Sequence, residues 1–145
     1  MNAAAAINIL TVLAGVDKPA FEAPEGYWSR GKYAPFGAYY VKRRDAIAIT
    51  RPMLADITNE HELAFLLGHE LGHRALNHGF MQMAFHRQDC EKAADAYAVR
   101  LLSGKGYDLA KILLWFDRRI AAQQGSARRK MAARKAAILN IIEGV

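Results

Sequence analysis

The sequence of 145 residues is poor in cysteine and proline and contains no apolar run long enough to cross a membrane. The single cysteine, Cys90, excludes an internal disulfide, so the fold depends on its core. A membrane span needs about 20 consecutive apolar residues, and the apolar stretch in residues 1–16 is shorter and interrupted by Asn8. That stretch also lacks a preceding Lys or Arg, unlike a signal peptide. We therefore expect a soluble, cytoplasmic protein whose first residues form a helix docked on the core.

Acidic residues are scarce only at the C-terminal end of the chain. The formal net charge is +6, and residues 111–145, with 8 basic and 2 acidic side chains, account for all of it. Within that segment, residues 126–142 predict a basic amphipathic helix. Such a helix could bind nucleic acid or an anionic surface, or cover a cleft. An ordinary terminal helix with its basic side chains in water is the favoured interpretation.

The order of predicted elements indicates one α+β domain spanning residues 1–145. Residues 17–37 have the Pro, Gly and aromatic content of a structured loop. Residues 38–43 and 46–50 read as strands because apolar and β-branched positions alternate there. Four helices are predicted to follow, starting near Asn59 and covering about 87–103, 108–124 and 126–142. The fold is therefore expected to be mostly helical, with one small sheet near the N-terminus.

The strongest chemical signal is the segment His69-Glu70-Leu71-Gly72-His73 within the first of these helices. Asn59 can cap this helix, with Glu62 in the position that completes a capping box. Histidines four residues apart lie on one helix face, where two imidazoles can bind one ion. Zinc accepts nitrogen and carboxylate ligands in tetrahedral geometry and leaves one position for water at catalytic sites. Glu70 lies beside this face and can reach that water as general base.

A third metal ligand is predicted on the next helix. Glu91 follows His73 by 18 residues and shares a helix face with Asp95. We expect Glu91 to bind the metal and Asp95 to orient a ligand histidine from behind. Ala94 on this helix and Gly72 on the first are small enough to let the helices approach closely. A solvated acidic face is the alternative interpretation of the two carboxylates.

The remaining histidines give weaker signals. His78 lies nine residues after His69, one short of the third histidine of the metzincin pattern, so that class is excluded. His78 is interpreted as a helix-end residue that favours the C-terminal dipole. His86 precedes the second helix and is a candidate, though not a favoured one, for stabilising an oxyanion.

Two separated motifs resemble the HtpX-like zinc peptidases, which are gluzincins. The first is residues 62–73, and the second is Glu91-x-x-Ala94-Asp95-x-Tyr97-Ala98 followed by Gly106-Tyr107-Asp108. The resemblance covers about residues 46–110 and, without membrane helices, is nearest to the soluble minigluzincins. It implies a zincin-type domain with an active-site helix and a glutamate helix. It also implies Zn²⁺ bound by His69, His73 and Glu91, Glu70 as general base, and Asp95 behind the ligands.

The predicted function is hydrolysis of peptide bonds in protein or peptide substrates, with a zinc-activated water and Glu70 as base. The resemblance suggests that the strand with Ala46, Ile47, Ala48 and Ile49 is the edge strand of the cleft, to which a substrate peptide adds. An internal strand paired on both sides is the alternative.

Two other functions remain open. An ImmA/IrrE-like regulatory protease shares the same chemistry, although Ala94-Asp95 and Gly106-Tyr107-Asp108 favour the HtpX-like group. A non-enzymatic zinc-containing binding module would act through its basic C-terminal helix, but it would have no need of Glu70.

Overall fold

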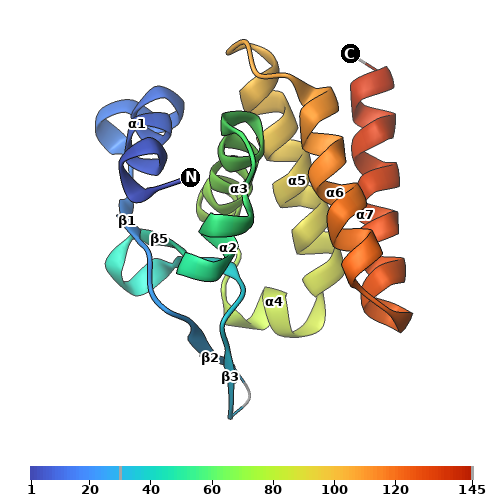
Figure 1. Ribbon diagram of the computed structural model, residues 1–145, viewed down its shortest axis with the longest axis horizontal. Helices are drawn as coiled ribbons and strands as arrows, with labels where there is room; N and C mark the ends of the chain where they lie inside the picture. Colours follow the sequence, from blue (N-terminus) through green and yellow to red (C-terminus); the bar gives the residue numbers. More distant parts are fainter. Residues whose placement is uncertain (30, 145) are drawn as a thin grey trace.

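The computed structural model describes residues 1–29 and 31–144 of the chain. Helix α3 (Glu60–Ala75) runs through the middle, with α1 (Ala3–Ala14) on one side (Figure 1). On the other side, α5 (Arg87–Ser103), α6 (Leu109–Ala122) and α7 (Gly125–Glu143) lie next to one another (Figure 1). The predicted bounds of these helices agree with the structure to within two residues, and α1 is docked on the core as expected.

A three-stranded sheet lies beside α3, in the order β1 (Ala20–Glu22), β5 (Ala46–Ile49), β4 (Ala38–Val41). β5 is parallel to β1 and antiparallel to β4, so both of its edges are paired. The expected edge position of residues 46–49 is therefore wrong. All four side chains of β5 are buried, and a strand that is apolar on both faces is typical of a sheet interior.

The segment predicted as a structured loop contains more regular structure than expected. Besides β1, it forms a hairpin of β2 (Tyr27–Ser29) and β3 (Lys32–Ala34) that projects from the body (Figure 1). Gly37, just after this hairpin, lies against the ring of Tyr27, which a Cβ at that position would displace. Strands of three residues are too short for alternation to reveal them in the sequence.

Short helices precede and follow α3. Pro52 lies in the first turn of α2 (Arg51–Asp56), where its fixed φ suits a helix start, whereas α4 (Phe80–Phe85) was not expected. At the start of α3, the Asn59 side chain accepts a hydrogen bond from the Glu62 N–H at 3.0 Å. The Glu62 carboxylate does not return to Asn59, but accepts from Thr58 and Arg118 instead. Only half of the predicted capping box is therefore present.

Helices α3 and α5 cross closely enough to exclude side chains at two glycines. A Cβ on Gly72 would lie 3.0 Å from the backbone of Ala94, and one on Gly68 would lie 3.2 Å from the Cβ of Ala98. The predicted approach of Gly72 and Ala94 is confirmed. This crossing brings the polar face of α5 onto the histidine face of α3.

The arrangement is mostly helical with a small sheet, as the α+β prediction states. Within residues 1–29 and 31–144, no helix is long and apolar enough to cross a membrane.

Candidate metal centre

The two histidines of the H-E-x-x-H segment point to one spot on α3. The Nε2 atoms of His69 and His73 lie 3.0 Å apart, and both side chains are buried. Glu70, also buried, has a carboxylate oxygen 4.0 Å from the Nε2 of His69. One donor atom from each of these three residues lies within 4.8 Å of the other two. The spacing of four residues therefore brings the two imidazoles together on one face of α3, as the sequence predicts.

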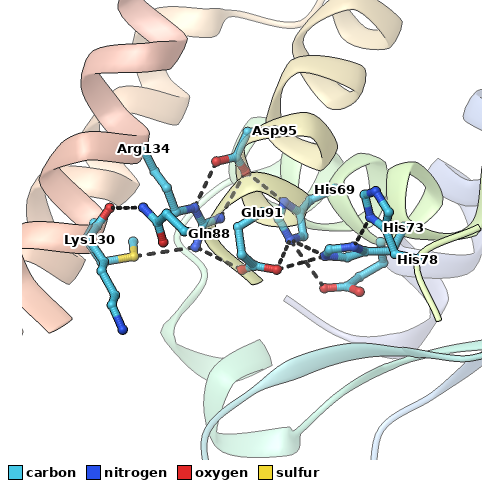
Figure 2. A network of polar contacts seen from close by, with 10 residues as sticks. His69, His73, His78, Gln88, Glu91, Asp95, Lys130 and Arg134 are labelled. Atoms are coloured by element: carbon cyan, nitrogen blue, oxygen red, sulfur yellow. Dashed lines mark hydrogen bonds and ion pairs between the residues drawn. The ribbon is translucent and has the colours of Figure 1, made fainter. Parts of the chain in front are cut away.

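Glu91 approaches the same spot from α5, across the close helix crossing (Figure 2). Its Oε1 lies 3.0 Å from the Nε2 of His73 and 3.7 Å from the Nε2 of His69. Glu91 is thus nearer to the histidine pair than Glu70 is, and its carboxylate is the better third donor.

The separations of these donor atoms suit a small tetrahedral cation. Zinc bonds of about 2.0–2.2 Å at tetrahedral angles place neighbouring ligand atoms about 3.3 Å apart. The three separations among His69, His73 and Glu91 are 3.0, 3.0 and 3.7 Å, which bracket that value. Two imidazoles and one carboxylate are also ligand types that zinc accepts. The residues present therefore fit a zinc ion.

Asp95 lies behind His69, as predicted. Its Oδ1 is 2.7 Å from the Nδ1 of His69, so the proton of that ring sits on Nδ1 and Nε2 faces the centre. Arg134 of α7 in turn donates two hydrogen bonds to Asp95, at 2.8 and 2.9 Å, and lies 3.4 Å from Glu91 (Figure 2). Side chains from three helices thus hold the ring of His69 in place.

His73 has a different partner. After the end of α3, Asn77 adopts a left-handed conformation with φ of 54°, and the N–H of His78 bonds to the carbonyl of His73 at 3.0 Å. This turn folds the chain back, as in a Schellman motif. It leaves the Nδ1 atoms of His78 and His73 2.8 Å apart (Figure 2).

The surrounding charges favour a cation at the centre. Burial disfavours the imidazolium of His69, but hydrogen bonds to Asp95 and Glu91 outweigh burial and raise its pKa to about 10. Burial also opposes ionisation of Glu91, yet the hydrogen bonds from His69 and His73 hold its pKa well below the usual range. A metal ion can supply the same positive charge in place of a proton.

Glu70 is in a different electrostatic situation. Its burial raises its pKa above the ordinary value of 4.5, and the two histidines only partly offset this effect. A raised pKa makes this carboxylate a better proton acceptor, which favours a role in general acid–base catalysis.

The centre opens into a cleft of about 210 Å³. One wall is β4, which contributes Ala38, Tyr39 and Tyr40, while the other includes Arg87. The four residues of β5 and His86 are not among the lining residues, so neither the substrate role for β5 nor the oxyanion role for His86 gains support. Trp115 also lines the cleft, and its buried indole N–H has no partner in the described part of the chain.

Sequence reasoning missed the roles of Arg134 and His78. Arg134 was assigned to a solvated basic face, but only 12% of its side chain is exposed. It lies three residues after Met131 and four before the buried Ile138, on the packed side of α7. That helical spacing is the signal that sets Arg134 apart from Arg128, Arg129 and Lys130, which are exposed.

The centre places two imidazoles and a carboxylate around one position and a second carboxylate beside it, an arrangement that could hold a metal ion. The sequence model of peptidase family M48 matches residues 14–88, just over half of the chain, and the chain belongs to that family of metallopeptidases. The match includes His69, Glu70 and His73 but ends before Glu91 and Asp95. No curated protein and no solved structure matches the chain.

Proposed function

We propose that the protein is a zinc-dependent peptidase in which His69, His73 and Glu91 bind the metal. The convergence of the Glu91 carboxylate on both Nε2 atoms, at 3.0 and 3.7 Å, carries the proposal. Membership of family M48 supports the peptidase activity, and the donor set supports zinc. Zincin-type architecture and the HtpX-like, minigluzincin-like subtype are part of the same proposal.

The reaction divides between the ion and the protein. A bound zinc ion supplies Lewis-acid chemistry, which acidifies water and polarises the scissile carbonyl. Glu70 accepts the proton of the attacking water and passes it to the leaving amine. Its burial and raised pKa suit both transfers. Asp95 and His78 keep the protons of the ligand histidines on Nδ1, so that both Nε2 atoms stay free for the metal.

The substrate is proposed to bind along β4. This strand is at the edge of the sheet, and Ala38, Tyr39 and Tyr40 line the cleft. An extended peptide can add to such an edge through main-chain hydrogen bonds, next to the metal centre. We therefore assign to β4 the substrate-binding role that was predicted for Ala46–Ile49. Such binding fits a peptidase that acts on extended protein or peptide segments.

The proposal is tested with purified wild type, Glu91→Ala and Glu70→Gln, prepared without added metal. We expect one zinc per chain in wild type and in Glu70→Gln, and loss of zinc in Glu91→Ala. Hydrolysis of an unfolded protein such as reduced casein should disappear in both variants. A Glu70→Gln variant with zinc and full hydrolysis would contradict the assigned base, and a zinc-free wild type that binds none on titration would contradict the metal site.

A further inference from the structure

A second cavity of about 230 Å³ lies beside the metal centre, between α5 and α7. Glu91 and Arg134 line both this cavity and the cleft, so the two spaces adjoin at Glu91. Arg87 and Gln88 form one wall of the second cavity, and Lys130 belongs to the other. A hydrogen bond from the Gln88 side chain to the carbonyl of Lys130, at 3.3 Å, joins the two walls (Figure 2).

Two of the three cations that line this cavity are not neutralised by the described part of the protein. Within residues 1–29 and 31–144, neither Arg87 nor Lys130 forms an ion pair, and both are exposed. Among the described residues, Glu91 is the only carboxylate that lines the cavity, and its charge is already shared by the two histidines and Arg134. An anionic group that entered would therefore meet two cations without displacing any intramolecular partner.

The backbone adds to this positive potential. Arg87 and Gln88 belong to the first turn of α5, and Ala127 to the first turn of α7, and all three line the cavity. Neither His86 nor Gln124, the residues that precede these helices, caps them with a side-chain hydrogen bond. The first turns of two helices, one of 17 residues and one of 19, thus border the cavity, and their partial positive charge adds to that of the two cations.

We propose that this cavity is a subsite for a carboxylate of the substrate, bound by Arg87 and Lys130 next to the scissile bond. The proposal rests on the proposed peptidase function and names its substrate class: peptides with an acidic group near the cleavage site. It also gives a role to one residue of the basic terminal helix. The carboxylate can belong to an internal Asp or Glu side chain or to a free C-terminus, and the experiment separates these sources.

The test uses internally quenched peptides that share one neutral, C-terminally amidated sequence cleaved by the wild type. Each peptide carries Glu, Gln or Lys at one position, and the positions tested run from three residues before the scissile bond to three residues after it. A separate set lacks acidic side chains and ends two or three residues after the scissile bond, either as a free acid or as an amide. Values of kcat/KM are compared for wild type, Arg87→Gln/Lys130→Gln and Arg129→Gln, an exposed cation outside the cavity that serves as a matched control.

We expect wild type to prefer Glu over Gln at one position, or the free acid over the amide, by about fivefold, the size of a partly exposed ion pair. The preference should fall below about twofold in the double variant and persist in Arg129→Gln. Which set shows the preference identifies the source of the carboxylate. The absence of any preference, or one that survives in the double variant, would overturn the subsite while Glu70-dependent cleavage leaves the peptidase function intact.

A binding measurement keeps the two proposals separate if no peptide is cleaved. Fluorescence anisotropy then compares the labelled Glu, Gln, acid and amide peptides on zinc-loaded Glu70→Gln protein, with and without the two cavity substitutions. Tighter binding of the acidic peptides that is lost with the substitutions supports the cavity even though the peptidase function fails. Equal binding of all the peptides overturns the subsite.

Discussion

Arg134 and Asp95 form a two-point ion pair between α7 and α5, with hydrogen bonds of 2.8 and 2.9 Å, and Asp95 in turn contacts the Nδ1 of His69. Both side chains are largely buried, with 12% and 1% of their areas exposed. Although burial opposes its ionisation, hydrogen bonds from Arg134 and His69 hold the pKa of Asp95 below its ordinary value. The C-terminal helix is therefore connected to the metal centre through one carboxylate.

Replacing Arg134 with Ala should weaken zinc binding by about 10- to 100-fold, because groups behind metal ligands hold them in position. Zinc affinity is measured by competition with a chromophoric chelator, and circular dichroism reports whether the fold persists. Arg134→Lys should recover only part of the affinity, since an ammonium lacks the two-point geometry of guanidinium. Arg129→Ala is the matched control from the exposed side of α7. Equal zinc affinity in Arg134→Ala and wild type would contradict the positioning role.

His78→Ala should weaken zinc binding by roughly tenfold, since it leaves the Nδ1 of His73 without its partner. His78→Asn retains a side-chain acceptor and should therefore lose less zinc affinity than His78→Ala. The control is His86→Ala, because His86 is an exposed histidine that does not line the cleft. The same chelator competition applies, and a His78→Ala protein that binds zinc as tightly as His86→Ala would contradict the prediction.

Gly72→Ala should lower the free energy of unfolding by about 1–3 kcal/mol, because its methyl group would overlap the backbone of Ala94. The shift needed to relieve this overlap would also move α5 and weaken metal binding. Gly104→Ala serves as the control, since its Cβ would meet nothing within 4 Å. Urea denaturation of the two variants should give clearly different midpoints, and coincident midpoints would show that the helix crossing tolerates a methyl group.

The lowered pKa of Asp45 predicts that the free energy of unfolding depends on pH. A hydrogen bond from Tyr40, opposed in part by burial and helped by Arg74, holds its pKa below the ordinary value of 3.8. A lowered carboxyl pKa stabilises the fold above the unfolded pKa, and this contribution disappears as the pH falls through the lower folded value. Asp45→Asn should therefore cost less than about 1 kcal/mol at pH 7 and almost nothing near pH 2.

Asparagine suits this test because Asp45 has a left-handed φ of 47°, which Asn tolerates. Urea midpoints of wild type and Asp45→Asn between pH 7 and pH 2 measure the difference. A difference in urea midpoint that stays constant or grows as the pH falls would contradict the lowered pKa of Asp45.

The sequence by itself determined the parts of the site that depend on local spacing. The positions of His69 and His73 on one helix face follow from their separation of four residues, whatever surrounds them. The start of α3 follows from its capping residue Asn59, and the end of α5 follows from the glycine that comes directly after it. The pairing of Glu91 with this helix was also foreseen, because small residues on both helices permit a close crossing.

Tertiary structure decided what depends on contacts between distant segments. β5 became the central strand because β1, a three-residue strand with little signal of its own, pairs with its second edge. Arg134 lies on the packed side of α7, and not on the predicted solvated face, because α7 packs on α5 with Arg134 over Asp95. The cavity beside Glu91 exists because the first turns of α5 and α7 meet there. These contacts join residues 26 positions apart between β1 and β5 and 39 apart between Arg134 and Asp95, and no local pattern encodes a partner at such distances.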